Sequence, residues 1–236
     1  MAKTYKALSA LLTYPTADLQ YAADDIAAVL QDEGLISDPV LQPLLRLAKE
    51  IAIGDLYDLQ ERYTLLFDRS RSLSLHLFEH VHGESRDRGQ AMVDLAEHYD
   101  AQGFVIAANE LPDFLPLFLE FLSQIGAAEA HELLQQPLPI LEALTERLHE
   151  RRCSYAAVFA ALVAIAGGKG VPVPLGTAAD DDPEDFEALD KAWEEAAVSF
   201  GPGDWANGDD GCGKARLTTR IRAAIRSVHA QPNDPA

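Results

Sequence analysis

Apolar residues recur at three- and four-residue intervals through the first 170 residues, and this helical period limits the possible folds more than any other feature. No stretch alternates apolar and polar residues for long enough to predict a strand. Helix ends are indicated by Pro15, Gly34 and the pair Gly54-Asp55. The predicted helices, in chain order, cover about residues 5–12, 18–34, 38–52, 55–68, 85–103, 112–122, 127–136, 139–151 and 154–166.

The character of the chain changes at about residue 170. Residues 1–170 are predicted to form one all-α, multi-helix globular domain, with the very apolar helix at 115–122 in its centre. Residues 171–236 are predicted to be a weakly ordered acidic tail, because acids, prolines and glycines dominate most of it. The tail is predicted to end in a short basic amphipathic helix, which would carry Lys214, Arg216, Arg220, Arg222 and Arg226 and an apolar side of Leu217, Ile221, Ile225 and Val228.

The charge balance narrows the choice of partner. The sequence holds 38 acidic residues against 19 lysines and arginines, a formal net charge of −19. Because phosphate groups would be repelled, non-specific nucleic-acid binding is excluded for the body of the protein. A basic peptide or protein is the favoured partner.

Cysteine usage and hydropathy predict a cytoplasmic protein. Two cysteines, Cys153 and Cys212, do not make a disulfide scaffold and are typical of a reducing compartment. Residues 1–12 lack the apolar length and the cleavage site of a secretory signal. The longest uncharged apolar stretch, residues 153–168, is shorter than the ~20 residues of a spanning helix. We therefore expect no stable membrane association.

Motifs that would carry chemistry are incomplete. The segment from Gly208 to Ala215 has the glycine spacing and the lysine of a phosphate-binding loop, but Ala215 replaces the Mg²⁺-binding hydroxyl and no strand precedes it. Cys153 follows two arginines, which lower a thiol pKa, yet no oriented base can be named and packing is the commoner role. No catalytic residue is assigned, and we expect neither enzymatic activity nor a bound cofactor.

Histidines and acids gather between residues 76 and 84. His76 and His80 lie four residues apart and would share one side of a helix, close to His82, Glu79 and Glu84. The zinc-protease order His-Glu-x-x-His does not occur in the chain. A metal-dependent hydrolase using His76, His80 and Glu84 is one alternative, but histidines bonded to backbone or carboxylate groups are more common, and no metal ligand is assigned.

Two segments combine large apolar residues with charges. The first runs from Tyr63 to Arg69 and continues from Ser74 to Gly89, and the second runs from Glu110 to Leu122. Core packing and helix capping explain about half of these residues, with Asp113 in the first turn of a helix. A loop dense in paired charge beside an aromatic-lined helix is also typical of the rim of a peptide-binding groove.

The same segments resemble the signatures of the nitrate reductase molybdenum cofactor assembly chaperones, also called the delta subunit type. The first signature covers Leu66-Phe-Asp-Arg69 and Phe78-Glu-His-Val-His-Gly-Glu-Ser-Arg-Asp-Arg-Gly-Gln-Ala-Met92. The second is Glu110-Leu-Pro-Asp-Phe-Leu-Pro116, which is shared more loosely with the wider TorD-like redox-enzyme chaperones. Leu11-Leu-Thr-Tyr-Pro15 is also similar, and the resemblance extends over about residues 4–168.

The resemblance implies a dedicated cytoplasmic chaperone. Proteins of this family bind the apo catalytic (alpha) subunit of the respiratory nitrate reductase, notably through its N-terminal segment. They hold it until the molybdenum cofactor and an iron–sulfur cluster have been inserted, and they leave before the mature enzyme docks at the membrane. A generic acidic helical adaptor for another basic client is the second alternative.

The client-binding groove is predicted where the two signature segments fall: the helix end at 63–69, the charged loop at 79–88 and the start of the helix at 112–122. Apolar contact with the client is expected from Tyr63, Phe67 and Leu115. The charged members are Asp68, Glu79, Glu84 and Asp113, which would meet basic side chains, and Arg86 and Arg88, which would hold the rim in place.

Overall fold

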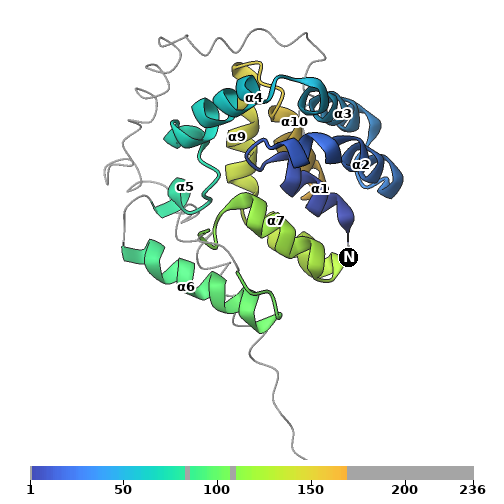
Figure 1. The fold of residues 1–236 in the computed structure, drawn as a ribbon. Coiled ribbons are helices and arrows are strands. Elements are labelled where there is room, and N and C mark those ends of the chain that lie inside the picture. Colours follow the sequence, from blue (N-terminus) through green and yellow to red (C-terminus); the bar gives the residue numbers. More distant parts are fainter. Residues whose placement is uncertain (1, 83–85, 107–109, 169–236) are drawn as a thin grey trace, which may run out of the picture.

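The computed structural model describes residues 2–82, 86–106 and 110–168, which form a helical body (Figure 1). The prediction of an all-α fold is confirmed for these residues, which contain one isolated β-bridge and no strand. The helices are α1 (Lys3–Leu11), α2 (Ala17–Glu33), α3 (Asp38–Ile53), α4 (Leu56–Tyr63), α5 (Glu79–His82), α6 (Arg86–Ala101), α7 (Leu115–Gln124), α8 (Ala127–Gln135), α9 (Leu138–Glu150) and α10 (Ala156–Ile165). A π-helical turn (Thr64–Asp68) extends α4, and a 3₁₀ turn (Arg71–Leu73) follows it.

Local residue types explain where the early helices begin and end. Thr16 Oγ1 accepts a hydrogen bond from Leu19 N at 3.2 Å and caps the start of α2. Gly34 ends α2 with φ 61°, a left-handed conformation that favours glycine. Asp55 Oδ1 accepts from Tyr57 N at 2.8 Å and caps α4. The boundaries predicted at Gly34 and at Asp55 are confirmed.

The centre of the body is α10. Every residue from Ala156 to Val163 is buried, and α10 packs against α9 and α3 (Figure 1). The expectation that the helix at 115–122 is central is therefore wrong. Residues 156–163 are apolar on every side of the helix, whereas Glu120 keeps one side of α7 at the surface.

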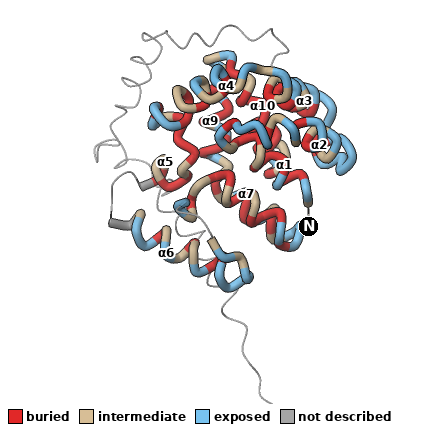
Figure 2. The backbone as a smooth tube through the Cα atoms, in the orientation of Figure 1, coloured by how far each residue is buried: buried red, intermediate tan, exposed pale blue. Residues whose placement is uncertain are grey.

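Helices α3, α2, α1 and α7 pack one against the next. α1 packs between α2 and α7, and α2 packs against α3. Ser9 Oγ donates to Pro116 O at 2.6 Å and ties α1 to the first turn of α7. α6 lies at the edge of the body below α7 in the view of Figure 1, and only a narrow side of it is buried (Figure 2).

α7 begins three residues later than the sequence predicts. The helix was expected from Pro112, but its first residue is Leu115. Residues 112 and 113 form a turn instead, and the carbonyl oxygen of Asp113 accepts a hydrogen bond from Leu77 N at 3.0 Å. Pairing with a distant segment overrides the local helix preference here.

The acidic tail is expected to be dispensable for folding. It lies outside the described residues, together with Cys212, the glycine-rich segment at 208–215 and the predicted basic helix. Truncation after Gly170 is expected to leave the thermal midpoint nearly unchanged, because the tail composition offers too little apolar area to offset ordering entropy. Circular dichroism melting of both lengths checks this. A collapse of the fold on truncation, seen as a fall of more than about 10 °C, roughly 3–5 kcal/mol at this size, would contradict it.

Candidate functional site

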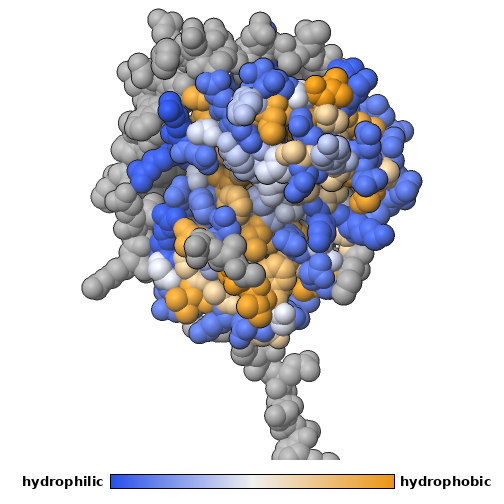
Figure 3. All heavy atoms as spheres, in the orientation of Figure 1, coloured by the Kyte–Doolittle hydropathy of each residue, from blue (hydrophilic) through white to orange (hydrophobic). Residues whose placement is uncertain are grey.

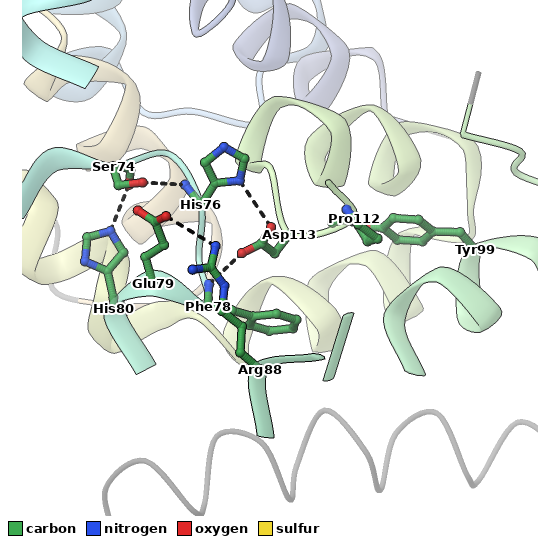
Figure 4. A network of polar contacts seen from close by, with 9 residues as sticks. All are labelled: Ser74, His76, Phe78, Glu79, His80, Arg88, Tyr99, Pro112 and Asp113. Atoms are coloured by element: carbon green, nitrogen blue, oxygen red, sulfur yellow. Dashed lines mark hydrogen bonds and ion pairs between the residues drawn. The ribbon is translucent and has the colours of Figure 1, made fainter. Parts of the chain in front are cut away.

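Two signature segments, far apart in the sequence, pair side by side at the start of α7 (Figure 4). Leu77 N donates to Asp113 O at 3.0 Å, and Leu115 N donates to Leu75 O at 2.8 Å. One of these segments leads into α5 and the other into α7. Their pairing therefore fixes how the ends of these two helices lie relative to each other.

The Asp113 carboxylate forms the centre of the contact network in Figure 4. The residue is fully buried, Oδ2 accepts from Phe78 N at 3.0 Å, and Oδ1 lies 3.2 Å from His76 Nδ1. A buried carboxylate is costly unless it is hydrogen-bonded, and these two bonds supply that compensation. Asp113 therefore cross-links two segments, and its predicted place in the first turn of a helix is wrong.

Two further contacts attach α6 to the network. Arg88 Nη2 lies 3.2 Å from Glu79 Oε1, which joins α6 to α5. Tyr99 OH donates to Pro112 O at 2.8 Å, which joins the other end of α6 to the segment before α7. A helix at the edge of the body is thus held at both ends by residues of the signature segments.

The histidines do not converge on a common point. His76 lies outside a helix, because α5 begins only at Glu79, so the predicted shared side with His80 is wrong. His80 Nε2 instead lies 2.8 Å from Ser74 O. Among the described residues no group of three His, Cys, Asp or Glu side chains could hold a metal ion, and Glu84 lies outside them. The geometry gives no support to a metal-dependent hydrolase.

Protonation of His76 is expected to stabilise the fold. The hydrogen bond to Asp113 raises the pKa of His76 above its ordinary value of about 6.5, against the opposing effect of burial. Since the folded-state pKa is raised, this stabilisation is fully present below about pH 6.5 and is lost as the pH rises through the raised pKa. The difference in unfolding free energy between wild type and His76→Gln, measured by urea denaturation, is therefore expected to be larger near pH 5.5 than near pH 9.

The pH-dependent contribution of His80, the second histidine of the network, cancels in this comparison. Burial lowers the pKa of His80, so its contribution runs in the opposite direction with pH, but His80 is present in both proteins. An equal difference in unfolding free energy between wild type and His76→Gln at both pH values would show that Asp113 does not stabilise the protonated imidazole.

The structure encloses the residues that were expected to give apolar contact. Tyr63, Phe67 and Leu115 are all buried. The ring of Phe67 lies 5.0 Å from that of Tyr63 and 5.2 Å from that of Tyr155, which precedes α10. Tyr63 OH also donates to Leu12 O at 2.9 Å. In this conformation these side chains support the predicted groove from inside.

The charged members of the predicted groove lie at different depths. Asp68 is exposed at the end of the π-helical turn. Glu79 and Arg88 are half-buried and paired with each other. Arg86 begins α6 without a described side chain, and Glu84 lies outside the described residues. The structure thus brings Glu79, Arg88 and Asp113 into one network and leaves Asp68 beside it.

An exposed apolar surface adjoins this network. We call it the α7 face, and its members are Phe104, Val105, Ile106, Leu111, Phe114 and Leu117. Val105 is 73% exposed and Leu111 is 44% exposed, while the others are partly buried against the core. In Figure 3, hydrophobic side chains gather over the lower half of this side, where α6 and α7 lie.

Ring contacts join the α7 face to the network and to the core. The Phe114 ring lies 5.3 Å from the His76 ring, so one end of the face touches the network. The Phe104 ring lies 5.6 Å from that of Phe121, which places residues 104–106 beside α7. Sequence reasoning missed this surface, although the sequence held a signal: α7 is apolar nearly all round and cannot bury every side.

Two remaining expectations concern Cys153 and the membrane. Cys153 is a buried cysteine that precedes α10, which fits a packing role. Within the described ranges, no helix has both the length and the apolar character needed to cross a membrane.

A helical body with two cross-linked signature segments beside an exposed apolar face has the layout of a helical protein-binding module. Its described site consists of the α7 face, which can contact a partner, and the network around Asp113, which holds that face in place. The comparison with known proteins gives the family: the chain belongs to the family described as nitrate reductase delta subunit, whose model matches residues 18–161. The resemblance found in the sequence motifs is thereby confirmed.

Three relatives illustrate the range of similarity. The nitrate reductase molybdenum cofactor assembly chaperone NarJ of Escherichia coli K12 is 40% identical over 230 residues, which are 95% of this chain and 93% of the relative. A probable chaperone of the same description, NarW of the same strain, is 38% identical over 83% of this chain and 82% of its own. A probable NarJ of Bacillus subtilis 168 is 30% identical over 71% of this chain and 90% of its own.

Proposed function

We propose that this chain is a dedicated chaperone that binds the apo catalytic subunit of a respiratory nitrate reductase. It keeps that subunit competent for insertion of the molybdenum cofactor and an iron–sulfur cluster, in the cytoplasm and before membrane docking. The names of relatives aligned over more than nine-tenths of both chains support the client class. The strong acidic charge supports a client segment that is basic.

The observation that carries this function is the position of the signature segments. They are cross-linked through buried Asp113 at one end of the exposed α7 face, so the motif residues hold a contact surface in place. A rigid support beneath an apolar surface reduces the ordering entropy that binding would otherwise cost.

The client segment docks along the α7 face and over the adjoining network in this proposal. The apolar contacts come from the exposed members of the face, such as Val105 and Leu111. The residues predicted from the sequence act around and beneath it: the charged rim is formed by Asp68, Glu79, Glu84, Arg86 and Arg88, and the support by Tyr63, Phe67, Asp113 and Leu115.

Binding and release need no covalent chemistry. Before cofactor insertion the client exposes an open cleft, and a chaperone that prefers this open state shifts its population by its differential affinity for the two states. Closure of the client around the inserted cofactor removes the preferred state, and the chaperone leaves.

Salt is expected to slow client capture more than it speeds release. The chain is acidic and the client segment is basic in this proposal, so charge steers the encounter while apolar contacts hold the complex. Exposed charges separated by more than about 10 Å are screened at 0.1 M salt. Surface plasmon resonance with an N-terminal client peptide checks this. An association rate that does not change with salt would remove electrostatic steering from the account.

Affinity capture from cells grown by nitrate respiration tests the proposed function. The tagged chain is expected to retain the nitrate reductase catalytic subunit, identified by mass spectrometry. Val105→Asp places a charge on the α7 face and is expected to lose the client. Ile53→Asp is the matched control, because Ile53 is 75% exposed at the end of α3. Capture of a different basic protein instead would favour the generic adaptor, and equal loss in both variants would move the contact away from the α7 face.

A further inference from the structure

The sequence beyond the described residues contains a segment whose chemistry matches the α7 face. Residues 214–228 hold five lysines and arginines and no acid, in a chain that is otherwise strongly acidic. Leu217, Ile221, Ile225 and Val228 follow one another at intervals of four, four and three residues. This spacing places four apolar side chains on one side of a helix and most of the cations elsewhere.

Acidic side chains border the α7 face and complement this segment. Glu110 directly precedes Leu111 and is exposed. Glu120 lies three residues after Leu117 on the same side of α7, and its side chain is 44% exposed. Lys6 Nζ lies 3.6 Å from Glu120 Oε1, but such an exposed pair contributes little and yields readily to another cation.

We propose that residues 214–228 dock on the α7 face of their own chain and compete there with the client. This inference rests on the proposed function, which supplies the competitor. Leu217, Ile221, Ile225 and Val228 cover the apolar members of the face, and the cations approach Glu110 and Glu120. A client segment that is basic and partly apolar then binds the α7 face only when it displaces residues 214–228. Peptides that bind the face weakly are therefore rejected.

The chain between the helical body and residues 214–228 is long enough for the segment to reach the α7 face. Residues 169–213 separate the end of the described chain from the segment, and these 45 residues span at most ~160 Å when extended. A body of this size measures roughly 40 Å across. A segment tethered in this way acts at an effective concentration on the order of 1 mM.

The expected effect on client affinity follows from this concentration. If the free segment binds with a dissociation constant of roughly 0.1 mM, the α7 face is vacant in about one chain in eleven. The apparent affinity for the client is then about tenfold weaker than the affinity of the vacant face. Removal of the apolar side of the segment should therefore tighten client binding about tenfold.

Two double variants of the full-length protein isolate this contribution. Ile221→Asp/Ile225→Asp destroys the apolar side of the segment, whereas Thr219→Asp/Ala223→Asp adds the same charge on the opposite side of the helix. Isothermal titration calorimetry with a synthetic peptide of the catalytic subunit's N-terminal segment gives the affinity. We expect about tenfold tighter binding for the first variant and a change within about twofold for the second.

Each outcome separates the inference from the proposed function. Equal affinity of all three proteins would overturn internal competition and leave the proposed function intact, whereas absence of binding in all three would contradict the proposed function. Light scattering gives the oligomeric state, and a wild-type dimer that the Ile variant dissociates would place the segment on a second copy and overturn docking within one chain. A synthetic 214–228 peptide should displace the client peptide from the Ile variant, whereas the same peptide carrying the Ile221→Asp and Ile225→Asp changes should not.

Discussion

Replacement of Phe118 by alanine is expected to lower the free energy of unfolding by about 3–5 kcal/mol. Phe118 is buried on the side of α7 that faces the body, and its removal both forfeits apolar burial and leaves a cavity. α7 packs against α1, where Ser9 bonds to Pro116, so the surrounding helices cannot easily collapse into the space. Urea denaturation followed by circular dichroism measures the loss.

The neighbouring residue provides the control for this change. Leu117 is half-buried on the other side of α7, and Leu117→Ala is expected to cost clearly less than Phe118→Ala. A loss below about 1 kcal/mol for Phe118→Ala would place its ring at the surface and contradict the orientation of α7.

Asp113→Ala is expected to destabilise the protein by about 3 kcal/mol. The change leaves the buried Phe78 N–H without its acceptor, which costs about 1–3 kcal/mol, and it removes the partner of His76. The His76 side chain is 28% exposed, so the loss is expected at the lower end of the 3–5 kcal/mol that follows from breaking a buried pair. Urea unfolding at neutral pH measures it.

Asp113→Asn separates the hydrogen bonds of this residue from its charge. The asparagine oxygen can still accept from Phe78 N, and the amide can donate to a neutral His76 ring, so the thermal midpoint is expected to stay within a few degrees of wild type. The stabilisation at low pH that His76 contributes should disappear in this variant. A loss for Asp113→Asn as large as that for Asp113→Ala would show that the charge, and not the hydrogen bonding, holds the two segments together.

Local sequence signals predicted most of the fold, because the helix ends depend on residues close to one another. Gly34 and Asp55 each act within one helical turn, and an uninterrupted run of apolar residues identified the buried helix α10. The start of α7 was missed because Asp113 is drawn into pairing with Leu77, a contact across 36 positions that no local pattern reports.

The meeting of the two signature segments was predicted from the sequence, but the depth at which their side chains lie was not. The signature segments do meet, yet aromatic residues at helical spacing serve a buried core and an open groove equally well. Tyr63 and Phe67 therefore could not be assigned to one of these roles without the packing of Tyr155 against them. Likewise, the sequence places His76 and Asp113 in separate motifs, and only the fold brings their side chains within 3.2 Å.

Preference for the unfinished client distinguishes a dedicated assembly chaperone from a generic adaptor, and it can be measured directly. The catalytic subunit of the nitrate reductase from the same organism would be produced once in cells that make molybdenum cofactor and once in cells that do not. Its binding to the purified full-length chaperone would then be measured by co-purification and calorimetry. We expect a stable complex with the cofactor-free subunit and at least about tenfold weaker binding to the loaded one, equivalent to about 1.4 kcal/mol. Equal affinity for both forms would contradict this expectation.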